Sequence, residues 1–114
     1  MRIERELMRG AGPLAVLQLL EKREMYGYEL VEALSEQTDG VLAMGQSTLY
    51  PLLYNLEAKS LVTSHWSRAE NGRKRKYYGL TAKGEGWLCA RREQWQRLVG
   101  AMKRLGVVAP GGDD

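Results

Sequence analysis

The spacing of hydrophobic residues changes twice along the chain, and this change restricts the possible folds more than any other feature. Four leucines recur at helical spacing over residues 47–59. Two strand-like segments, 62–67 and 74–80, then flank Asn71-Gly72, a dipeptide typical of a hairpin turn because both residues tolerate positive φ. Helical spacing returns over residues 82–105, after Thr81 as a candidate N-cap. The pattern predicts a helix, a hairpin and a long final helix.

Three shorter helices are predicted before this unit, over residues 3–8, 14–23 and 27–38. Gly10-Ala11-Gly12 is expected to separate the first two, and Pro13 suits the start of the second. Asp39-Gly40 is expected to end the third. A short strand near residues 41–44 is expected to join the hairpin as its third member.

The helix over residues 47–59 has two start signals. Ser47 is the expected N-cap, and Pro51 is expected to lie within a residue or two of the helix start, because proline lacks the backbone N–H. The order of elements predicts a mainly α fold with a small β-hairpin wing, a winged helix-turn-helix with a long C-terminal dimerisation helix. The expected division is residues 1–80, 81–106 and 107–114 for the winged-helix domain, the dimerisation helix and a flexible tail.

Composition narrows the class of protein. The chain has 114 residues, of which 44% are hydrophobic and 27% charged, as in one folded domain. Its single cysteine, Cys89, excludes an intrachain disulfide and is expected to be packed rather than reactive. The longest apolar stretch, Leu14–Leu20, is too short to span a bilayer. The first six residues alternate charges where a signal peptide needs an apolar run, so a cytoplasmic location is expected.

Positive charge is concentrated in one short segment. Residues 59–83 hold seven Lys/Arg and one acidic residue, whereas residues 1–58 hold five Lys/Arg and nine acidic residues. The last 31 residues, 84–114, are nearly balanced, with five Lys/Arg and four acidic residues. A local basic segment of this kind is typical of a polyanion-binding surface.

The predicted DNA-binding residues come from one helix face and the hairpin. In helix-turn-helix proteins the later helix enters the major groove. The polar face of the helix predicted over residues 47–59 offers Ser47, Thr48, Tyr50, Tyr54 and Asn55, and the hairpin adds Arg73, Lys74, Arg75 and Lys76, with Arg68 nearby. Strand alternation means that the four consecutive bases do not all face one side. Half-buried packing of the tyrosines and a solvated edge strand are the structural alternatives.

Three segments with sequence motifs in a fixed order resemble the PadR-like family of transcriptional regulators. They are Met25-Tyr26-Gly27-Tyr28-Glu29-Leu30, then Ser47-Thr48-Leu49-Tyr50-Pro51-Leu52-Leu53-Tyr54-Asn55-Leu56-Glu57 with Leu61-Val62, and Gly72-Arg73-Lys74-Arg75-Lys76-Tyr77-Tyr78-Gly79-Leu80-Thr81-Ala82-Lys83-Gly84. The resemblance covers roughly residues 5–105. The short length and single C-terminal helix are similar to the small subfamily.

The resemblance implies a homodimer, usually a repressor, that binds a palindromic operator. It implies that the helix carrying Thr48 and Tyr50 enters the major groove and that the last helix dimerises. The chain departs from the family at Ser60, where glycine is common after this helix. A left-handed C-cap is easier for glycine, so the turn after the helix is the part of the fold that this departure affects.

The last helix carries a seam with coiled-coil-like spacing. Trp95, Leu98, Met102 and Leu105 are spaced three, four and three residues apart, so they are the predicted dimer interface. Some relatives bind aromatic or cationic drugs beside a tryptophan on this helix, and the resemblance implies such an effector site near Trp95, Trp87, Met8 and Met102. Aromatic rings stack on indole and cations are attracted to its face. Simple interface packing of Trp95 is the alternative.

No catalytic or metal-binding pattern is present in the sequence. His65 and Cys89 lie on different predicted elements, and no phosphate loop or nucleophile motif occurs. We therefore expect no enzyme activity, no metal and no cofactor. The predicted function is a dimeric, sequence-specific DNA-binding regulator, a repressor released by a small molecule. The alternatives are a winged-helix adaptor that binds an acidic protein partner, and a small-molecule binder that has lost DNA binding.

Overall fold

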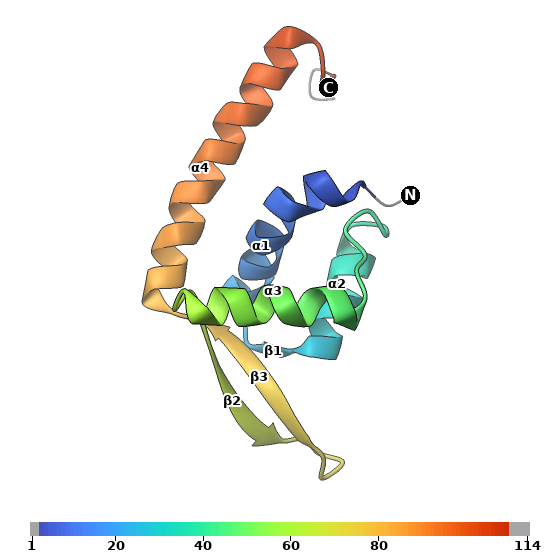
Figure 1. The fold of residues 1–114 in the computed structure, drawn as a ribbon, viewed down its shortest axis with the longest axis vertical. Coiled ribbons are helices and arrows are strands. Elements are labelled where there is room, and N and C mark those ends of the chain that lie inside the picture. Colours follow the sequence, from blue (N-terminus) through green and yellow to red (C-terminus); the bar gives the residue numbers. More distant parts are fainter. Residues whose placement is uncertain (1–2, 110–114) are drawn as a thin grey trace.

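The computed structural model describes residues 3–109, in which three helices precede a hairpin and a long final helix (Figure 1). The elements are α1 Arg5–Lys22, β1 Met25–Tyr26, α2 Gly27–Gln37, α3 Gln46–Ala58, β2 Val62–Arg68, β3 Lys74–Leu80 and α4 Ala82–Leu105. This order confirms the predicted fold class, mainly α with a hairpin wing and a long last helix. Of the predicted tail, residues 110–114 lie outside the described part, as do residues 1–2 of the predicted first domain.

α1 is one helix, so the prediction of two helices separated at Gly10-Ala11-Gly12 was wrong. Gly12 is buried, and a Cβ on it would lie 3.1 Å from Leu52 Cδ1 of α3. The glycine therefore serves close packing of two helices, which outweighs its poor helix propensity. Pro13 lies inside the helix rather than at its start.

The third strand is β1, not the segment near residues 41–44. The sheet is antiparallel with the order β1-β3-β2, and Met25 pairs with Tyr78. Residues 41–44 instead belong to the turn between α2 and α3, where Val41 N–H donates to Thr38 O. An apolar residue of this turn packs into the core, since Met44 is buried. Hydrophobicity alone does not distinguish a turn with a buried side chain from a short strand, which is why the prediction was wrong.

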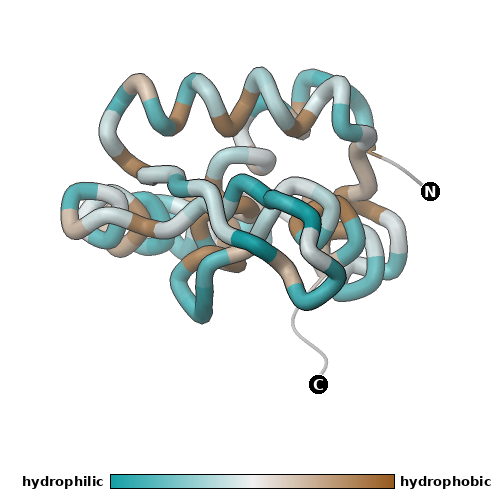
Figure 2. The backbone as a smooth tube through the Cα atoms, turned by 90° about the horizontal axis from the view of Figure 1, so that it is seen from below, coloured by the Kyte–Doolittle hydropathy of each residue, from teal (hydrophilic) through white to brown (hydrophobic). Residues whose placement is uncertain are grey.

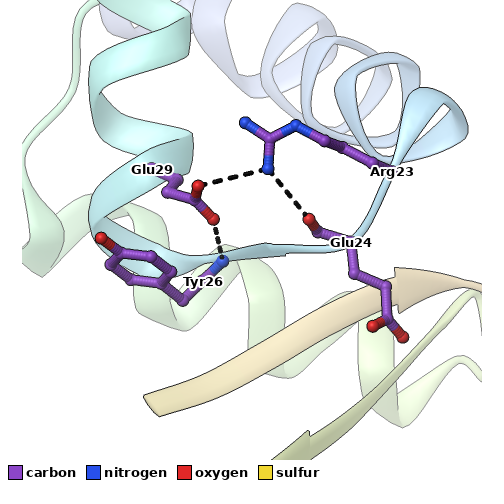
Figure 3. Close-up of polar contacts among 4 residues, drawn as sticks. All are labelled: Arg23, Glu24, Tyr26 and Glu29. Atoms are coloured by element: carbon purple, nitrogen blue, oxygen red, sulfur yellow. Dashed lines mark hydrogen bonds and ion pairs between the residues drawn. The ribbon is translucent and has the colours of Figure 1, made fainter. Parts of the chain in front are cut away.

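The short connection from α1 through β1 to α2 is held by Glu29 (Figure 3). One Glu29 carboxylate oxygen accepts from the backbone N–H of Tyr26, the N-cap of α2, at 3.2 Å. The other accepts from Arg23 Nη1 at 3.2 Å, and the same guanidinium nitrogen donates to Glu24 O at 3.3 Å. A glutamate at this helix position satisfies a backbone donor that the helix leaves free.

α3 begins earlier than predicted. Gly45 is the N-cap, so Ser47 is not, and Pro51 lies five residues beyond the first helical residue rather than at the start. Three leucines of the predicted stripe, Leu49, Leu53 and Leu56, are buried, and the fourth, Leu52, is half-buried beside Gly12 of α1. Figure 2 shows the hydrophobic positions of α3 on the turns that face the rest of the fold. The opposite side of the helix is exposed.

The hairpin between β2 and β3 is confirmed, but its turn is longer than a two-residue Asn-Gly turn. Ala69 N–H donates to Arg73 O, and Gly72 N–H donates to Ala69 O. Residues 70–72 therefore form a three-residue loop, in which Gly72 alone has positive φ. A glycine in this conformation is typical of three-residue hairpin loops.

α4 starts where the sequence predicts. Thr81 is its N-cap, and its side-chain oxygen accepts from Gly84 N–H at 2.9 Å. The helix is fixed to α1 by Arg92, whose Nη1 donates to Gln18 Oε1 at 2.9 Å and to Glu21 Oε1 at 3.0 Å. This guanidinium lowers the pKa of Glu21. Beyond this anchor, α4 extends away from the other helices (Figure 1).

No helix within residues 3–109 has the length and hydropathy needed to cross a membrane.

Candidate nucleic-acid interface

The two faces of the wing carry different side chains. Because side chains alternate along a strand, residues paired across β2 and β3 share a face. We call the face that meets α3 the inner wing face; it carries Ser64, Trp66, Arg68, Lys74, Lys76 and Tyr78. We call the opposite one the outer wing face; it carries Tyr26, His65, Arg75 and Tyr77.

Direct contacts join α3 to the inner wing face. Lys76 Nζ lies 5.9 Å from the ring centre of Tyr54, the side chain of which is 54% exposed on α3. Ser64 Oγ donates to Glu57 Oε2 at 2.6 Å, which ties β2 to the same helix. The exposed side of α3 and the basic side of the wing therefore form one continuous surface, as a nucleic-acid interface requires.

Tyr78 supports this surface from beneath. Its side chain is fully buried, and burial raises its pKa to about 12, so the phenol stays neutral. Its hydroxyl has no hydrogen-bond partner among residues 3–109. Lys76 Nζ lies 5.7 Å from the Tyr78 ring centre, so the lysine amine is near the rings of both Tyr54 and Tyr78.

The predicted polar residues of α3 do not all face the same way. Ser47 and Tyr54 are exposed. Tyr50 is half-buried, and its hydroxyl group occupies the space beside Gly27 that a larger residue there would fill. Thr48 and Asn55 are exposed but line a groove on the side of α3 away from the wing. The structure thus brings Tyr54 to the wing and separates Thr48 and Asn55 from it.

The four predicted wing bases divide between the two faces, as strand alternation predicts. Lys74 and Lys76 lie on the inner wing face, whereas the Arg75 guanidinium lies 4.4 Å from the Tyr26 ring centre on the outer one. Arg73 is exposed in the hairpin loop. The sequence analysis did not predict Trp66 as a site residue. Trp66 pairs with Lys76 on the inner wing face, so the register of β2 with β3 identifies it, whereas its residue type alone does not.

The outer wing face is an aromatic cluster. The rings of Tyr26 and Tyr77 meet edge to face at 5.4 Å, and His65 stacks on Tyr77 at 6.0 Å. His65 Nε2 lies 2.9 Å from Glu24 Oε1, and this hydrogen bond raises the pKa of His65. These contacts join β1 to the hairpin.

A groove of about 600 Å³ lies between α1, α3 and the first turns of α4. Two of the predicted effector residues, Met8 and Trp87, line it. Its charged lining is entirely basic, consisting of Arg5, Arg9, Lys59 and Arg91. The Arg91 guanidinium lies 4.1 Å from the Trp87 ring centre.

The other predicted effector and interface residues lie farther along α4. Trp95 lines a separate hollow of about 350 Å³ with Val99 and Lys103. Leu98 is 46% exposed and Leu105 is 77% exposed, so within residues 3–109 this apolar stripe is not covered. Within one chain, Met8 and Trp87 therefore share one groove, whereas Trp95 lies at a separate hollow.

Cys89, expected to be packed, is exposed on α4, because Leu88 takes the buried position in this turn of the helix. No three His, Cys, Asp or Glu side chains within residues 3–109 form a cluster able to hold a metal ion.

Comparison with known proteins gives consistent matches. Residues 16–89 match the model of the transcriptional regulator PadR-like family. The transcriptional regulator YqjI of Escherichia coli is 34% identical over 90 residues, which cover 79% of this chain but only 42% of YqjI. A PadR family transcriptional regulator from Eggerthella lenta has a TM-score of 0.76 at 34% identity, covering 88% of this chain and 85% of that one. A Streptococcus transcriptional regulator has a TM-score of 0.80 at 31% identity, covering 90% and 99%.

Proposed function

The chain belongs to the transcriptional regulator PadR-like family, and from this premise we propose that it is a dimeric, sequence-specific DNA-binding repressor. The family model and the relatives reported above are those of transcriptional regulators and not of enzymes. One observation is the main support for the proposal. The exposed Tyr54 of α3 lies beside Lys76 of the wing, so α3, the helix expected to read the DNA (the reading helix), and the basic strand β3 share one surface.

In the proposed complex α3 enters the major groove and the wing contacts the adjacent backbone. Ser47 and Tyr54 face the DNA from α3, and Lys74, Lys76 and Arg68 neutralise phosphates from the inner wing face. Tyr50 supports the helix more than it reads bases, since half of its side chain is packed. Thr48 and Asn55 contact DNA only at the edge of the interface that borders the groove.

The proposed dimer forms through the free part of α4. The stripe of Trp95, Leu98, Met102 and Leu105 has the spacing of a helix–helix seam, and two of its leucines are exposed in the single chain. A second copy of the same helix buries them. Two reading helices then meet one face of the DNA about 34–36 Å apart, one helical turn.

The proposed effector is a flat aromatic molecule that binds between α4 and the rest of the fold. Trp87 in the groove offers a ring for stacking. The Arg91 guanidinium lies over one face of that ring, and all the charged side chains of the otherwise largely apolar groove are basic, so an aromatic ligand fits better than a cation. Such a ligand releases DNA only if it binds more tightly to the dimer conformation that cannot bind DNA than to the conformation that can.

The test is fluorescence anisotropy with a labelled duplex from the protein's own promoter region beside a scrambled duplex, at several salt concentrations. The proposal expects tight binding to the promoter alone, two protomers per site and a steep salt dependence. Tyr54→Ala should weaken binding, whereas Tyr28→Ala, which removes a similarly exposed aromatic ring from α2, should not. A folded protein that binds neither duplex at low salt would overturn the proposal and favour an adaptor.

A further inference from the structure

Trp66 is the most exposed large apolar side chain of the wing, at 65%. An indole carries more apolar surface than any other side chain, so leaving it in water forgoes a large part of its burial free energy. A single exposed apolar residue is ordinary on a protein surface, and exposure alone assigns no role. The position of Trp66 among its neighbours is what distinguishes it.

Paired residues form successive layers on the inner wing face. Ser64 and Tyr78 form the layer against α3, Trp66 and Lys76 the next, and Arg68 and Lys74 the layer toward the tip. Each layer is about 7 Å beyond the previous one. The indole therefore lies between the reading helix and the outermost pair of cations.

The position of Trp66 relative to α3 is fixed. The hydrogen bond of Ser64 to Glu57 of α3 holds β2 two residues before the tryptophan. Across the ladder, Lys76 is held beside Tyr54 of the same helix. The strand that carries the indole is therefore preorganised beside α3, which reduces the conformational entropy lost when the ring meets a flat partner.

We propose that Trp66 packs its ring against the deoxyribose groups of the DNA strand that borders the groove read by α3. Arg68 and Lys74, one layer farther out, neutralise phosphates of the same strand. The contact of the indole is apolar and touches no base edge, so it contributes affinity without selecting sequence and without releasing counterions. This inference rests on the proposed function.

The experiment compares full-length Trp66→Ala, Trp66→Phe and wild type for binding to the promoter duplex and the scrambled duplex over a range of salt concentrations. Trp66→Ala should weaken binding to both duplexes by the same factor, about tenfold, with an unchanged salt slope. Trp66→Phe should keep most of the affinity, because a smaller ring still covers the sugar. His65→Ala, which changes the neighbouring residue on the outer wing face, should bind as wild type.

Tryptophan emission gives a second measurement. Duplex binding should change the emission of wild type, and this change should be lost in Trp66→Phe although that variant still binds. Thermal melting of Trp66→Ala should match wild type, because the side chain is mostly exposed.

Different outcomes separate this inference from the proposed function. If wild type binds the promoter and Trp66→Ala binds equally well, this inference alone is wrong. The inference is also overturned if Trp66→Ala loses affinity only for the promoter, which indicates base reading, or melts at a lower temperature in proportion to its lost affinity. If wild type binds neither duplex, the proposed function fails first.

Discussion

Ser60 adopts a left-handed conformation, with φ of 63°, one residue beyond the C-cap of α3. Its N–H donates to Glu57 O, and the next N–H, that of Leu61, donates to Leu56 O. This pair of bonds is the Schellman motif, in which glycine is usual. The departure from the family at this position therefore leaves the turn geometry unchanged and places a side chain where it is sterically unfavourable.

Ser60→Gly should raise the free energy of unfolding by up to about 1 kcal/mol. The left-handed conformation costs a residue with a Cβ roughly 1–2 kcal/mol, whereas the extra freedom of glycine in the unfolded chain costs roughly 0.4–1 kcal/mol. Urea denaturation measures the difference. Ser67→Gly, in the extended strand β2, is the control and should lower stability. A loss of stability in Ser60→Gly would contradict this account.

Lys74 and Arg75 are adjacent in sequence and lie on opposite faces of the wing. Lys74→Ala should reduce the magnitude of the salt slope of DNA binding by about one unit, as expected for one lost phosphate contact. Arg75→Ala should change the slope less, because that guanidinium is held over Tyr26 on the outer wing face. Anisotropy titrations over a series of salt concentrations measure both slopes. Equal slopes for the two variants would show that the inner wing face is not the DNA-binding one.

At the scale of elements, the junction of the wing with α4 depends on a glycine. Gly84 is buried in the first turn of α4, and a Cβ there would overlap the backbone oxygen of Leu61 and lie 2.7 Å from Leu80 Cδ1. Gly86, two residues later, has open space around it. Both glycines weaken the helix by propensity, but only Gly84 is required by packing.

This difference predicts opposite effects of the same substitution. Gly84→Ala should destabilise the protein strongly, because a backbone carbonyl is not free to move away. Gly86→Ala should stabilise it by about 0.5–1 kcal/mol through helix propensity. Thermal melting and urea denaturation of the two variants, compared at the same protein concentration, measure the changes. If both variants were stabilised, the close approach of α4 to Leu61 would be wrong.

Elements with a clear hydrophobic period were predictable from the sequence, and those formed by long-range contacts were not. The helices α2, α3 and α4 and the hairpin carry their own periodic signals. α1 was divided at Gly12 because local propensity does not reveal that Leu52 packs there. β1 has only two residues, too few for a period, and exists because Met25 and Tyr26 pair with β3.

In the candidate site too, some features have a local sequence signal and others depend on long-range contacts. The basic wing and the polar face of α3 are visible as composition and spacing. The separation of Arg75 from Lys74 and Lys76, and the inclusion of Trp66, depend on the register of β2 with β3 and on which face meets α3. Tyr50 and Thr48 look equivalent to Tyr54 in the sequence, yet one packs beside Gly27 and the other lines the groove.

At the scale of the whole molecule, the proposed dimer depends on the part of α4 that projects beyond Arg92. Leu98→Glu should dissociate the proposed dimer, because a symmetric seam would bury two added charges. Arg97→Glu, at the neighbouring exposed position, adds a carboxylate outside the seam and should leave the dimer intact. Sedimentation velocity at several protein concentrations measures both. A Leu98→Glu protein that sediments as a dimer would place the interface elsewhere.

The wing and α4 are joined without a linker, since Leu80 ends β3 and Ala82 begins α4. The residue between them, Thr81, donates its hydroxyl to Ser60 O at 2.7 Å and accepts from Gly84 N–H, so the junction is stiff. A second anchor, Arg92, fixes α4 to α1, so the residues from Glu93 to Leu105, about 20 Å of helix, project beyond it. In the proposed dimer, the wing, the base of α4 and α1 therefore move as one rigid unit, and the direction in which the projecting part of α4 leaves that unit sets the distance between the two DNA-reading surfaces.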